Sequence, residues 1–513
     1  MFIKKSRKIE RLRLMVEESG LFDEEYYRSQ IPSCDDTDPL GHYLKEGWRL
    51  GCDPSRAFSS LFYYSAYPDI EAANVSPLVH FVEHGRAEGR FGLPLDDVPS
   101  IPGEVPEPAL PTIAEWRRVA NRANRTEHAV VDIVVPIYRG FTETLRCLFS
   151  ILDNPLKTKF RIVTVYDHGP DTSLFNALVR LSNIGLFDLL TTPRNLGFVA
   201  ACNVGLAHHH LRDVVMLNSD TQVYGDWLDR LRAAAYGSAK VATVTPFSNN
   251  AEICSYPRFV QNNREQIELA DADLDQVMAL ANRGMTIEIP TGVGFCMYVR
   301  RDALNEIGYL SEEHFGRGYG EENDLCRRAA GRGWSNLLAA DVFVRHYGGR
   351  SFGSDKSHLV EAAVRTVESL HPGYGALINH FVQRDPARSL RGAVDLARIK
   401  RRHAGRTSFL FVAHNWGGGT ERHVRELAER LEQDGVPVLI CRPSSSRLDY
   451  VSLFDLNLPD LYNLPQFSLR DGPSVFAEIL TSLNVMHVHI HQIVDFDGPA
   501  ADFFRRLCSI IPC

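Results

Sequence analysis

The pattern of apolar and polar positions along this chain predicts alternating strands and helices over most of its length. Short apolar runs that suit buried strands occupy residues 130–135, 161–165, 214–217, 408–413 and 436–441. Residues 142–152 follow the first run with the periodicity of an amphipathic helix. Alternation of strands and helices favours a mainly parallel sheet with helices on both faces. We therefore expect an α/β protein.

The N-terminal part has a different pattern, which contains an internal repeat. Residues 38–47 (DPLGHYLKEG) recur as residues 76–85 (SPLVHFVEHG), and an aromatic pair precedes each copy. Pro at the start and Gly at the end of each copy predict short helices with matching caps. We expect a small helical packing module. His42 and His80 should share a structural role in it, because no neighbouring Cys/His cluster completes a metal site.

Composition divides the chain into further parts. Prolines are concentrated between residues 94 and 111, which suits a semi-rigid linker, and residues 384–406 are basic. The expected organisation is a helical repeat module at 1–92, a Pro-rich linker at 93–128, an α/β domain at 129–383, a connector at 384–406 and a second α/β domain, incomplete, at 407–513.

Overall composition excludes some classes of protein. The 513 residues are 44% hydrophobic and 23% charged, as in an ordinary soluble protein, and the net charge of −8 argues against a nucleic-acid partner. The 10 cysteines include no Cys-x-x-Cys pair, which favours a reduced, cytoplasmic compartment. No apolar run reaches the roughly 20 residues of a membrane-spanning helix. The basic residues 4–8 suit either a solvated helix start or peripheral contact with the inner face of the cell membrane.

Residues with useful chemistry fall where the predicted strands end. Pro136 follows the first strand, Asp167 the second, and Asn218, Ser219 and Asp220 the third. Ligands of parallel sheets bind at the carboxyl ends of strands. An Asp in this position can hold Mg2+ or Mn2+, which prefers oxygen ligands and can bridge a diphosphate. The alternative is an Asp that caps the following helix or turn.

A second acidic cluster lies at residues 318–324 (GYGEEND). A carboxylate there could take the proton of an acceptor hydroxyl, and crowding with a second carboxylate would raise its pKa toward neutrality. The sequence does not separate Glu321 from Glu322 as the base, and both could instead stabilise a helix N-terminus. His346 follows the apolar run 342–344 and is either a metal or diphosphate contact or a satisfied structural histidine.

Six segments in order along residues 130–352 resemble family 2 glycosyltransferases with the GT-A fold, most strongly bacterial rhamnosyltransferase-like members. The segments are 134–138 (VVPIY), 195–198 with 203–205 (NLGF and NVG), 217–221 (LNSDT), 290–292 (PTG), 318–324 (GYGEEND) and 344–346 (VRH). Two positions depart from the family pattern. Asn218 stands where many members have an acid, and Tyr166-Asp167 stands where paired acids are usual.

The two ends of the chain carry weaker resemblances. The part after Ser408 resembles the first half of a family 4-like GT-B domain, with its Gly-rich turn at residues 417–419. That fold binds its nucleotide mainly in the other half, so this part should not transfer sugar alone. The N-terminal repeat resembles modules that precede such transferases in bacterial proteins.

The family 2 resemblance implies a role for each matching residue. It implies a nucleotide-sugar donor, a glycan or lipid-linked glycan acceptor, and Mg2+ or Mn2+ as cofactor. Catalysis falls to Glu322 with Glu321, and metal binding to Asp220 and His346. The implied donor-binding residues are Pro136, Tyr138, Asp167, Asn195, Gly197, Asn203, Asn218 and Ser219.

The leading hypothesis is therefore an inverting, metal-dependent glycosyltransferase that adds a hexose to a growing bacterial surface polysaccharide or lipopolysaccharide. A glycoside hydrolase is a rival, but it needs two opposed carboxylates and no metal. A non-catalytic carbohydrate-binding or scaffold protein with a degenerate GT-A domain is the other alternative, because Asn218 and Tyr166 replace expected acids.

Overall fold

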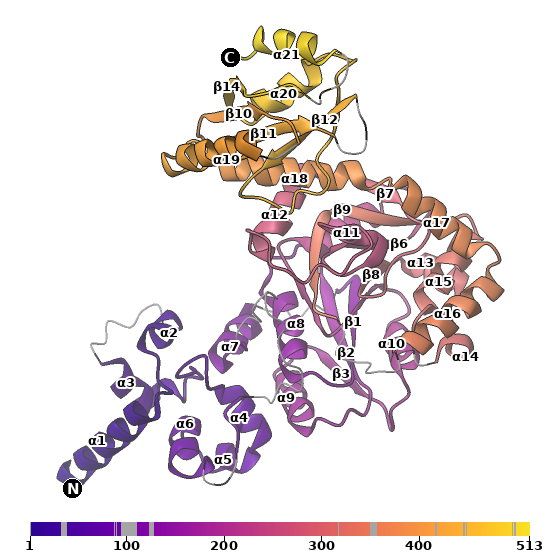
Figure 1. The fold of residues 1–513 in the computed structure, drawn as a ribbon. Helices are drawn as coiled ribbons and strands as arrows, with labels where there is room; N and C mark the ends of the chain where they lie inside the picture. Colours follow the sequence, from indigo (N-terminus) through magenta and orange to yellow (C-terminus); the bar gives the residue numbers. More distant parts are fainter. Residues whose placement is uncertain are drawn as a thin grey trace.

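The structure of the chain is a computed structural model (Figure 1). It describes residues 2–31, 38–86, 88, 90–93, 110–122, 128–316, 318–348, 356–415, 418–444, 447, 449–494, 496 and 499–513. Most of the expected Pro-rich linker and residue 417 of the Gly-rich turn lie outside these residues. A helical N-terminal part, a large α/β domain and a smaller α/β domain follow one another along the molecule (Figure 1).

Nine strands among the described residues form the sheet of the large domain, in the order β3-β2-β1-β4-β8-β6-β9-β5, with β7 beside β9. Their bounds are β1 Val131–Ile137, β2 Phe160–Tyr166, β3 Asp188–Thr191, β4 Asp213–Leu217, β5 Thr221–Val223, β6 Val241–Ser248, β7 Thr286–Glu288, β8 Cys296–Val299 and β9 Ser335–His346. The first four strands are parallel, as expected. Beyond them the sheet is mixed, because β8 lies antiparallel to both β4 and β6.

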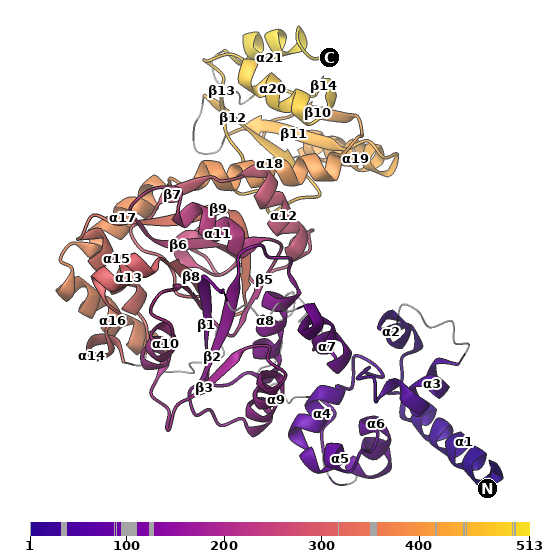
Figure 2. The same cartoon turned by 180° about the vertical axis from the view of Figure 1, so that it is seen from behind.

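Helices cover both faces of this sheet because β1 is apolar on both sides (Figure 2). Ile133 and Val135 pack with Leu145 of α8, whereas Val134, which points to the other face, packs with Val199 of α10. The helix bounds are α8 Phe141–Asp153, α9 Thr172–Asn183, α10 Phe198–Leu206, α11 Trp227–Ala235, η3 Glu252–Cys254, α12 Asp271–Ala281, α13 Arg301–Ile307, α14 Glu312–Phe315, α15 Glu321–Ala330, α16 Lys356–Leu370 and α17 Tyr374–Arg384.

The two sequence repeats make matching contacts in the N-terminal part. Tyr27 Oη lies 2.6 Å from His42 Nδ1, and Tyr63 Oη lies 2.8 Å from His80 Nδ1. Each tyrosine also covers the glycine that ends its repeat, so there is no room for a Cβ atom at Gly47. The elements are α1 Phe2–Ser19, α2 Glu24–Ser29, α3 Pro39–His42, η1 Tyr43–Gly47, α4 Ser60–Ala66, α5 Pro68–Ala72, α6 Pro77–His80, η2 Phe81–Gly85 and α7 Ile113–Arg122.

The smaller domain has a sheet of five strands in the described part of the chain, ordered β13-β12-β11-β10-β14. Its strands are β10 Ser408–Val412, β11 Val438–Pro443, β12 Tyr450–Asp455, β13 Phe467–Ser468 and β14 Val485–Ile490, and its helices are α19 Gly418–Gln433, α20 Ser474–Ser482 and α21 Ala500–Cys508. Cys508 and Cys513 form a disulfide.

The basic segment between the domains is a helix, α18 Arg388–His403, which lies between them in both views (Figures 1 and 2). Its Leu390 and Val394 belong to the core of the large domain, and its Ile399 belongs to the core of the small one. The helix is therefore part of two cores at once. Several of its charged residues pair with groups of the two domains.

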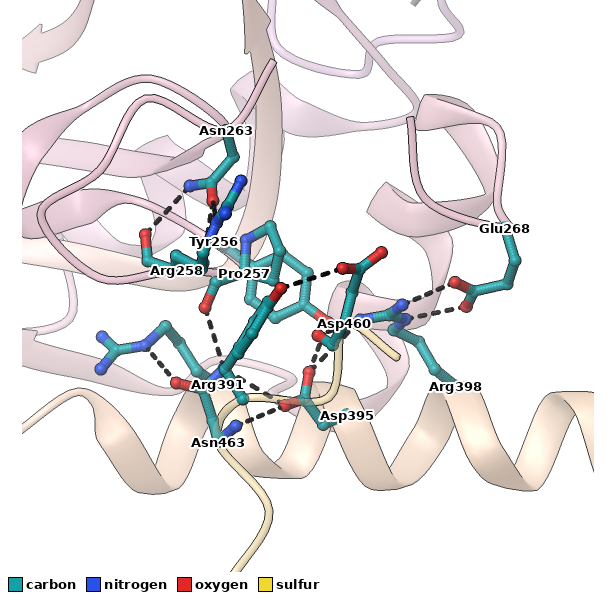
Figure 3. A network of polar contacts seen from close by, with 11 residues as sticks. Tyr256, Pro257, Arg258, Asn263, Glu268, Arg391, Asp395, Arg398, Asp460 and Asn463 are labelled. Carbon is teal, nitrogen blue, oxygen red and sulfur yellow. Dashed lines mark hydrogen bonds and ion pairs between the residues drawn. The ribbon is translucent and has the colours of Figure 1, made fainter. Parts of the chain in front are cut away.

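Figure 3 shows the polar network at this junction. Asp395 of α18 is fully buried and accepts hydrogen bonds from Tyr256 Oη at 2.7 Å and from the backbone N–H of Asn463 at 2.8 Å. Arg398 donates to Glu268 at 2.8 Å, and Arg391 donates to Asn463 Oδ1 at 2.9 Å. The network joins the loop after β6, helix α18 and the segment before β13.

Within the described residues, no helix combines the length and the apolar character needed to cross a membrane. A cavity of about 480 Å³ opens between α18 and the segment before β13, lined by residues such as Arg388, Leu396 and Pro465. It lies at the domain junction and not at the strand ends where the chemistry was expected.

Candidate active site

The expected site residues after β1, β2 and β4 lie at one edge of the sheet, because these neighbouring strands are parallel. Pro136 is the penultimate residue of β1, and Tyr138 follows the strand with 38% of its surface exposed. Asp167 directly follows β2, and Asn218 directly follows β4. This edge is the position at which α/β sheets bind ligands.

Asp167 is buried and organises the loop before α10. Its Oδ1 accepts from Thr192 Oγ1 and from the Leu196 N–H, both at 2.8 Å, and its Oδ2 accepts from the Gly197 N–H at 2.8 Å. Asn195 Oδ1 also accepts from the Gly197 N–H, at 2.9 Å. The carboxylate therefore shapes the loop, and its contact with a nucleotide base stays a prediction.

Asn203 is engaged on the other side of α10. Its amide donates to the Leu310 carbonyl at 2.9 Å and to Glu312 at 2.7 Å, and its Oδ1 accepts from the Leu310 N–H. These contacts give the residue a structural task, which is to hold α10 against the segment before α14. Its expected contact with the donor also stays a prediction.

Asp220 and His346 come together because β5 pairs antiparallel with β9, with Thr221 opposite His346. The carboxylate Oδ1 of Asp220 lies 3.6 Å from His346 Nε2, and its Oδ2 accepts from the Gly348 N–H at 3.1 Å. Sequence separation hides this proximity, since more than a hundred residues lie between the two.

The orientation of His346 is fixed from three sides. Its Nδ1 lies 2.8 Å from the carbonyl oxygen of Asn250, which can only accept, so Nδ1 carries the proton. Its backbone N–H donates to Asn249 Oδ1 at 2.9 Å. The ring of Phe295 stacks on the imidazole at 5.2 Å between centroids and 18° between planes. In the neutral ring the lone pair of Nε2 therefore faces Asp220.

This pair fits one divalent cation. A histidine that donates its other ring N–H to a carbonyl is the usual arrangement of a metal ligand. The separation of 3.6 Å is near that of two atoms that bind the same ion from adjacent positions. Asn218 and Ser219 directly precede Asp220, and both are partly exposed, so they can reach a ligand.

Glu321 and Glu322 begin helix α15, whose N-cap Gly320 has a φ of 90°. Each carboxylate has a buried Oε2 atom with no hydrogen-bond partner among the described residues. Such atoms are rare in folded proteins and suggest a missing partner such as a substrate. Asp324, one turn later, is instead paired with Arg328 at 2.8 Å and His371 at 2.8 Å.

The electrostatics distinguish the two glutamates. Burial raises the pKa of Glu321 well above its usual range, and the charge of Glu322 adds to the shift. Burial also raises the pKa of Glu322, and the charge of Glu252 adds to it, while backbone N–H groups partly offset the effect. Burial raises the pKa of the Cys202 thiol inside α10, with Glu321 as the larger charge contribution. Glu321 is buried, whereas Glu322 is partly exposed.

Two short segments connect the glutamates with the metal pair. Phe295 stacks on His346 and its carbonyl accepts from the Asn218 N–H at 2.8 Å. A Cβ atom placed on its neighbour Gly294 would lie 3.7 Å from the Glu322 carboxyl carbon. Glu252, two residues after Asn250, acts electrostatically on Glu322. The candidate base and the candidate metal ligands therefore line one site.

Sequence reasoning missed several residues of this site. Phe295 and Gly294 follow the PTG segment, and Asn249 and Asn250 directly follow β6, where a strand-end polar pair could have been noticed. No pattern in the sequence pointed to Tyr374 of α17 as a site residue. Burial raises the pKa of its hydroxyl, with the charge of Glu322 as the next cause, so it faces the glutamate.

A different group of possible metal ligands lies at the opposite edge of the sheet. One ligand atom each from Asp188, His208 and His209 lie within 4.8 Å of one another. Asp188 is, however, already ion-paired with Arg161 at 2.5 Å. The prediction that Asp220 and His346 hold the cation stays untested, and it is favoured by their place at the ligand-binding edge.

Comparisons with known proteins bear on this site. Residues 132–308 match the profile of Glycosyl transferase family 2. No curated protein matches the chain. Similar solved structures include GalNAc-T7 with UDP, GalNAc and Mn2+ (16% identity, TM-score 0.37, 60% of this chain and 55% of that one). Others are the Pyrobaculum calidifontis mannosyltransferase PcManGT with GDP-Man and Mn2+ (15%, 0.35, 62% and 87%) and S. aureus TarS 1-349 (16%, 0.30, 53% and 82%).

The chain thus spans about half the length of the first of these structures. The profile match covers Asp220 and the loop that Asp167 organises, and it ends before Glu322 and His346. Residues 132–308 of the chain are accordingly similar to a family 2 glycosyltransferase domain.

Proposed function

We propose that this protein is a glycosyltransferase, that it is metal-dependent and inverting, and that it moves a hexose from a nucleotide-sugar donor to a bacterial surface polysaccharide or lipid-linked glycan. The observation that carries the metal dependence is the geometry of His346, whose Nδ1 proton is held by Asn250 so that Nε2 faces Asp220. Mg2+ or Mn2+ in this position would neutralise charge that develops on the departing diphosphate.

The remaining steps fall to the protein's own groups. Asp167 holds the loop of Asn195 and Gly197 so that its backbone can approach the nucleotide. Glu322 takes the proton of the acceptor hydroxyl, since its unpartnered Oε2 and raised pKa suit a base near neutrality. A single displacement by that hydroxyl inverts the anomeric centre. Burial and the charge of Glu252 keep the pKa of Glu322 high.

The other parts of the chain fit supporting roles in this proposal. The N-terminal repeats form a packing module, and the small domain supplies the first half of a GT-B-like fold. The site works at the cytoplasmic side of the membrane, with the basic N-terminus as a peripheral contact to anionic lipid. The rhamnosyltransferase-like motifs favour a deoxyhexose or hexose donor.

The test is a panel of nucleotide sugars incubated with the full chain and Mn2+, with release of the nucleotide diphosphate as the readout. Asp220→Asn and His346→Ala should abolish release without changing the thermal unfolding midpoint by more than a few degrees. His210→Ala, a change at an exposed histidine outside the site, is the matched control. Full activity of either site variant, or of the wild type in EDTA, would refute the metal assignment.

Asymmetry between the glutamates gives a second test. Glu322→Gln should lose at least about a hundredfold in kcat with nearly unchanged donor affinity, because the change removes a proton acceptor but keeps the shape. The anomeric configuration of the product, read by NMR, tests the single displacement. A product with retained configuration would refute it.

A further inference from the structure

The loop between β6 and α12 touches the active site with its first residues. Asn249 accepts from the His346 N–H and donates to its carbonyl at 3.1 Å, and the Asn250 carbonyl holds Nδ1 of the same histidine. Glu252 follows in a left-handed conformation, with a φ of 47°. The loop thus sets both the direction of His346 and the position of a charge that acts on Glu322.

The same loop is anchored at its other end to the domain junction (Figure 3). Tyr256 is fully buried, and its hydroxyl donates to Asp395 and accepts from Arg398 at 2.9 Å. The Pro257 carbonyl accepts from Asn463 Nδ2, also at 2.9 Å. Asn463 belongs to the small domain, so that domain contacts the loop directly.

Hydrogen bonds within the loop restrain its backbone between these two ends. The Ala251 N–H donates to Ser255 Oγ at 3.0 Å, and the Tyr256 N–H donates to the Ser248 carbonyl at 2.9 Å. Asn263 Nδ2 donates to the Asn249 carbonyl at 3.1 Å. We expect a displacement of Tyr256 to reach Asn250 and Glu252, because these hydrogen bonds restrain the backbone between them.

We propose that Tyr256, Asp395 and Asn463 are positioning residues for glycosyl transfer, through which the small domain holds the β6–α12 loop in the conformation that aligns His346 and Glu252 with Glu322. The inference rests on the proposed roles of His346 and Glu322. It assigns to the small domain a part in the chemistry of the large one, although the site residues named above all belong to the large domain.

Several titratable groups besides Glu252 lie in the electrostatic environment of Glu322 and must stay in place for the test to be clear. They come from every element around it: Glu321 and Cys326 on α15, Cys202 on α10 and Tyr374 on α17. None of them contacts Tyr256 or Asn463 through a hydrogen bond described above. A change at the junction should therefore reach Glu322 through Glu252.

The experiment compares Tyr256→Phe and Asn463→Ala with wild type in the full chain. Both variants should lower kcat about tenfold with the donor KM changed less than about twofold, because small misplacement of catalytic groups is costly. The acidic limb of the pH–kcat profile should also move to lower pH, since a displaced Glu252 no longer raises the pKa of Glu322. Glu252→Gln should move the limb in the same direction.

Arg401→Ala is the matched control, because Arg401 pairs with Asp273 across the same junction at 2.7 Å but is exposed and outside the network. It should leave kcat and the pH limb unchanged. Unfolding midpoints of all variants show how much stability each change removes. A variant that only loses stability would have a lower apparent kcat because fewer molecules are folded. The acidic limb of its pH–kcat profile would stay at the pH of the wild type.

The outcomes separate the two proposals. An active Glu322→Gln enzyme would refute the proposed base, whatever the junction variants do. An inactive Glu322→Gln enzyme, together with junction variants whose kcat and pH limb match wild type, would refute the positioning role and leave the proposed function intact.

Discussion

Replacing Phe295 by Leu should weaken Mn2+ binding more than it weakens the fold. Phe295 is 2% exposed and lies flat on the His346 imidazole. Leu keeps part of the buried volume, so the stability cost should be about 1–2 kcal/mol, below the ~3–5 kcal/mol of a full truncation to Ala. The flat stacking surface is lost entirely.

The size of the metal effect follows from that stacking contact. A ring pair contributes about 0.5–1.5 kcal/mol beyond its buried area. If the contact serves to orient His346, the same energy appears as a loss of about two- to tenfold in Mn2+ affinity, since about 1.4 kcal/mol equals a factor of ten. The measurement is a titration of free Mn2+ by electron paramagnetic resonance, with thermal unfolding in parallel.

Phe343→Leu provides the matched control, because Phe343 is 1% exposed and lies on the same strand, β9, as His346. It should cost similar stability and leave Mn2+ affinity unchanged. Equal Mn2+ affinity in Phe295→Leu and wild type would show that stacking does not orient the ligand. Equal losses in both phenylalanine variants would show a general loosening of the strand.

The other predictions concern single residues. Burial and the charge of Glu322 raise the pKa of Glu321 well above its usual range, so Glu321 should be uncharged while Glu322 titrates. Glu321→Gln should therefore keep its activity and the acidic limb of its pH–rate profile; an inactive variant would exchange the roles of the two glutamates. Burial raises the pKa of Asp53 to about 7 in the folded protein, whereas an Asp in the unfolded chain has a pKa of about 3.9. Between these two values the folded form keeps a proton that the unfolded chain has lost. The local stability should therefore fall as pH rises from about 4 to 7. Asp53→Asn should remove that fall, as read by hydrogen exchange in α4, and a slope that persists would contradict the assignment. Gly47→Ala should unfold the first repeat because its methyl group overlaps Tyr27 Oη, whereas Gly419→Ala, which meets open space, should not change the thermal unfolding midpoint.

Much of the large domain could be predicted from local sequence pattern. The apolar run at 130–135 became β1, and the amphipathic stretch at 142–152 became α8, because burial on one or both faces is visible as periodicity. The position of Asp167 and Asp220 after strands also followed from this pattern. The antiparallel strand β8 did not, since strand direction depends on the path of the chain between strands.

The parts that escaped prediction depend on pairing between distant residues. The sequence predicted only a basic connector at residues 384–406, whereas Arg391 and Arg398 of helix α18 are buried and paired with groups that lie far away in the sequence. Likewise, His346 and Asn250 lie far apart in the sequence, although the hydrogen bond between them fixes the orientation of the imidazole ring. Neither the number of charged residues nor the motifs of a sequence show which charged side chain has a partner in the folded protein.

Helix α18 also sets how this protein can be recombined with its relatives. Because Asp395 accepts from Asn463 on one side and from Tyr256 on the other, no crossover point within residues 384–406 separates the two domains cleanly. A chimaera that exchanges the small domain must bring along a compatible residue at position 463, or it inherits a buried carboxylate without donors. Substitutions at Tyr256, Asp395 and Asn463 should therefore be correlated among homologues that keep both domains.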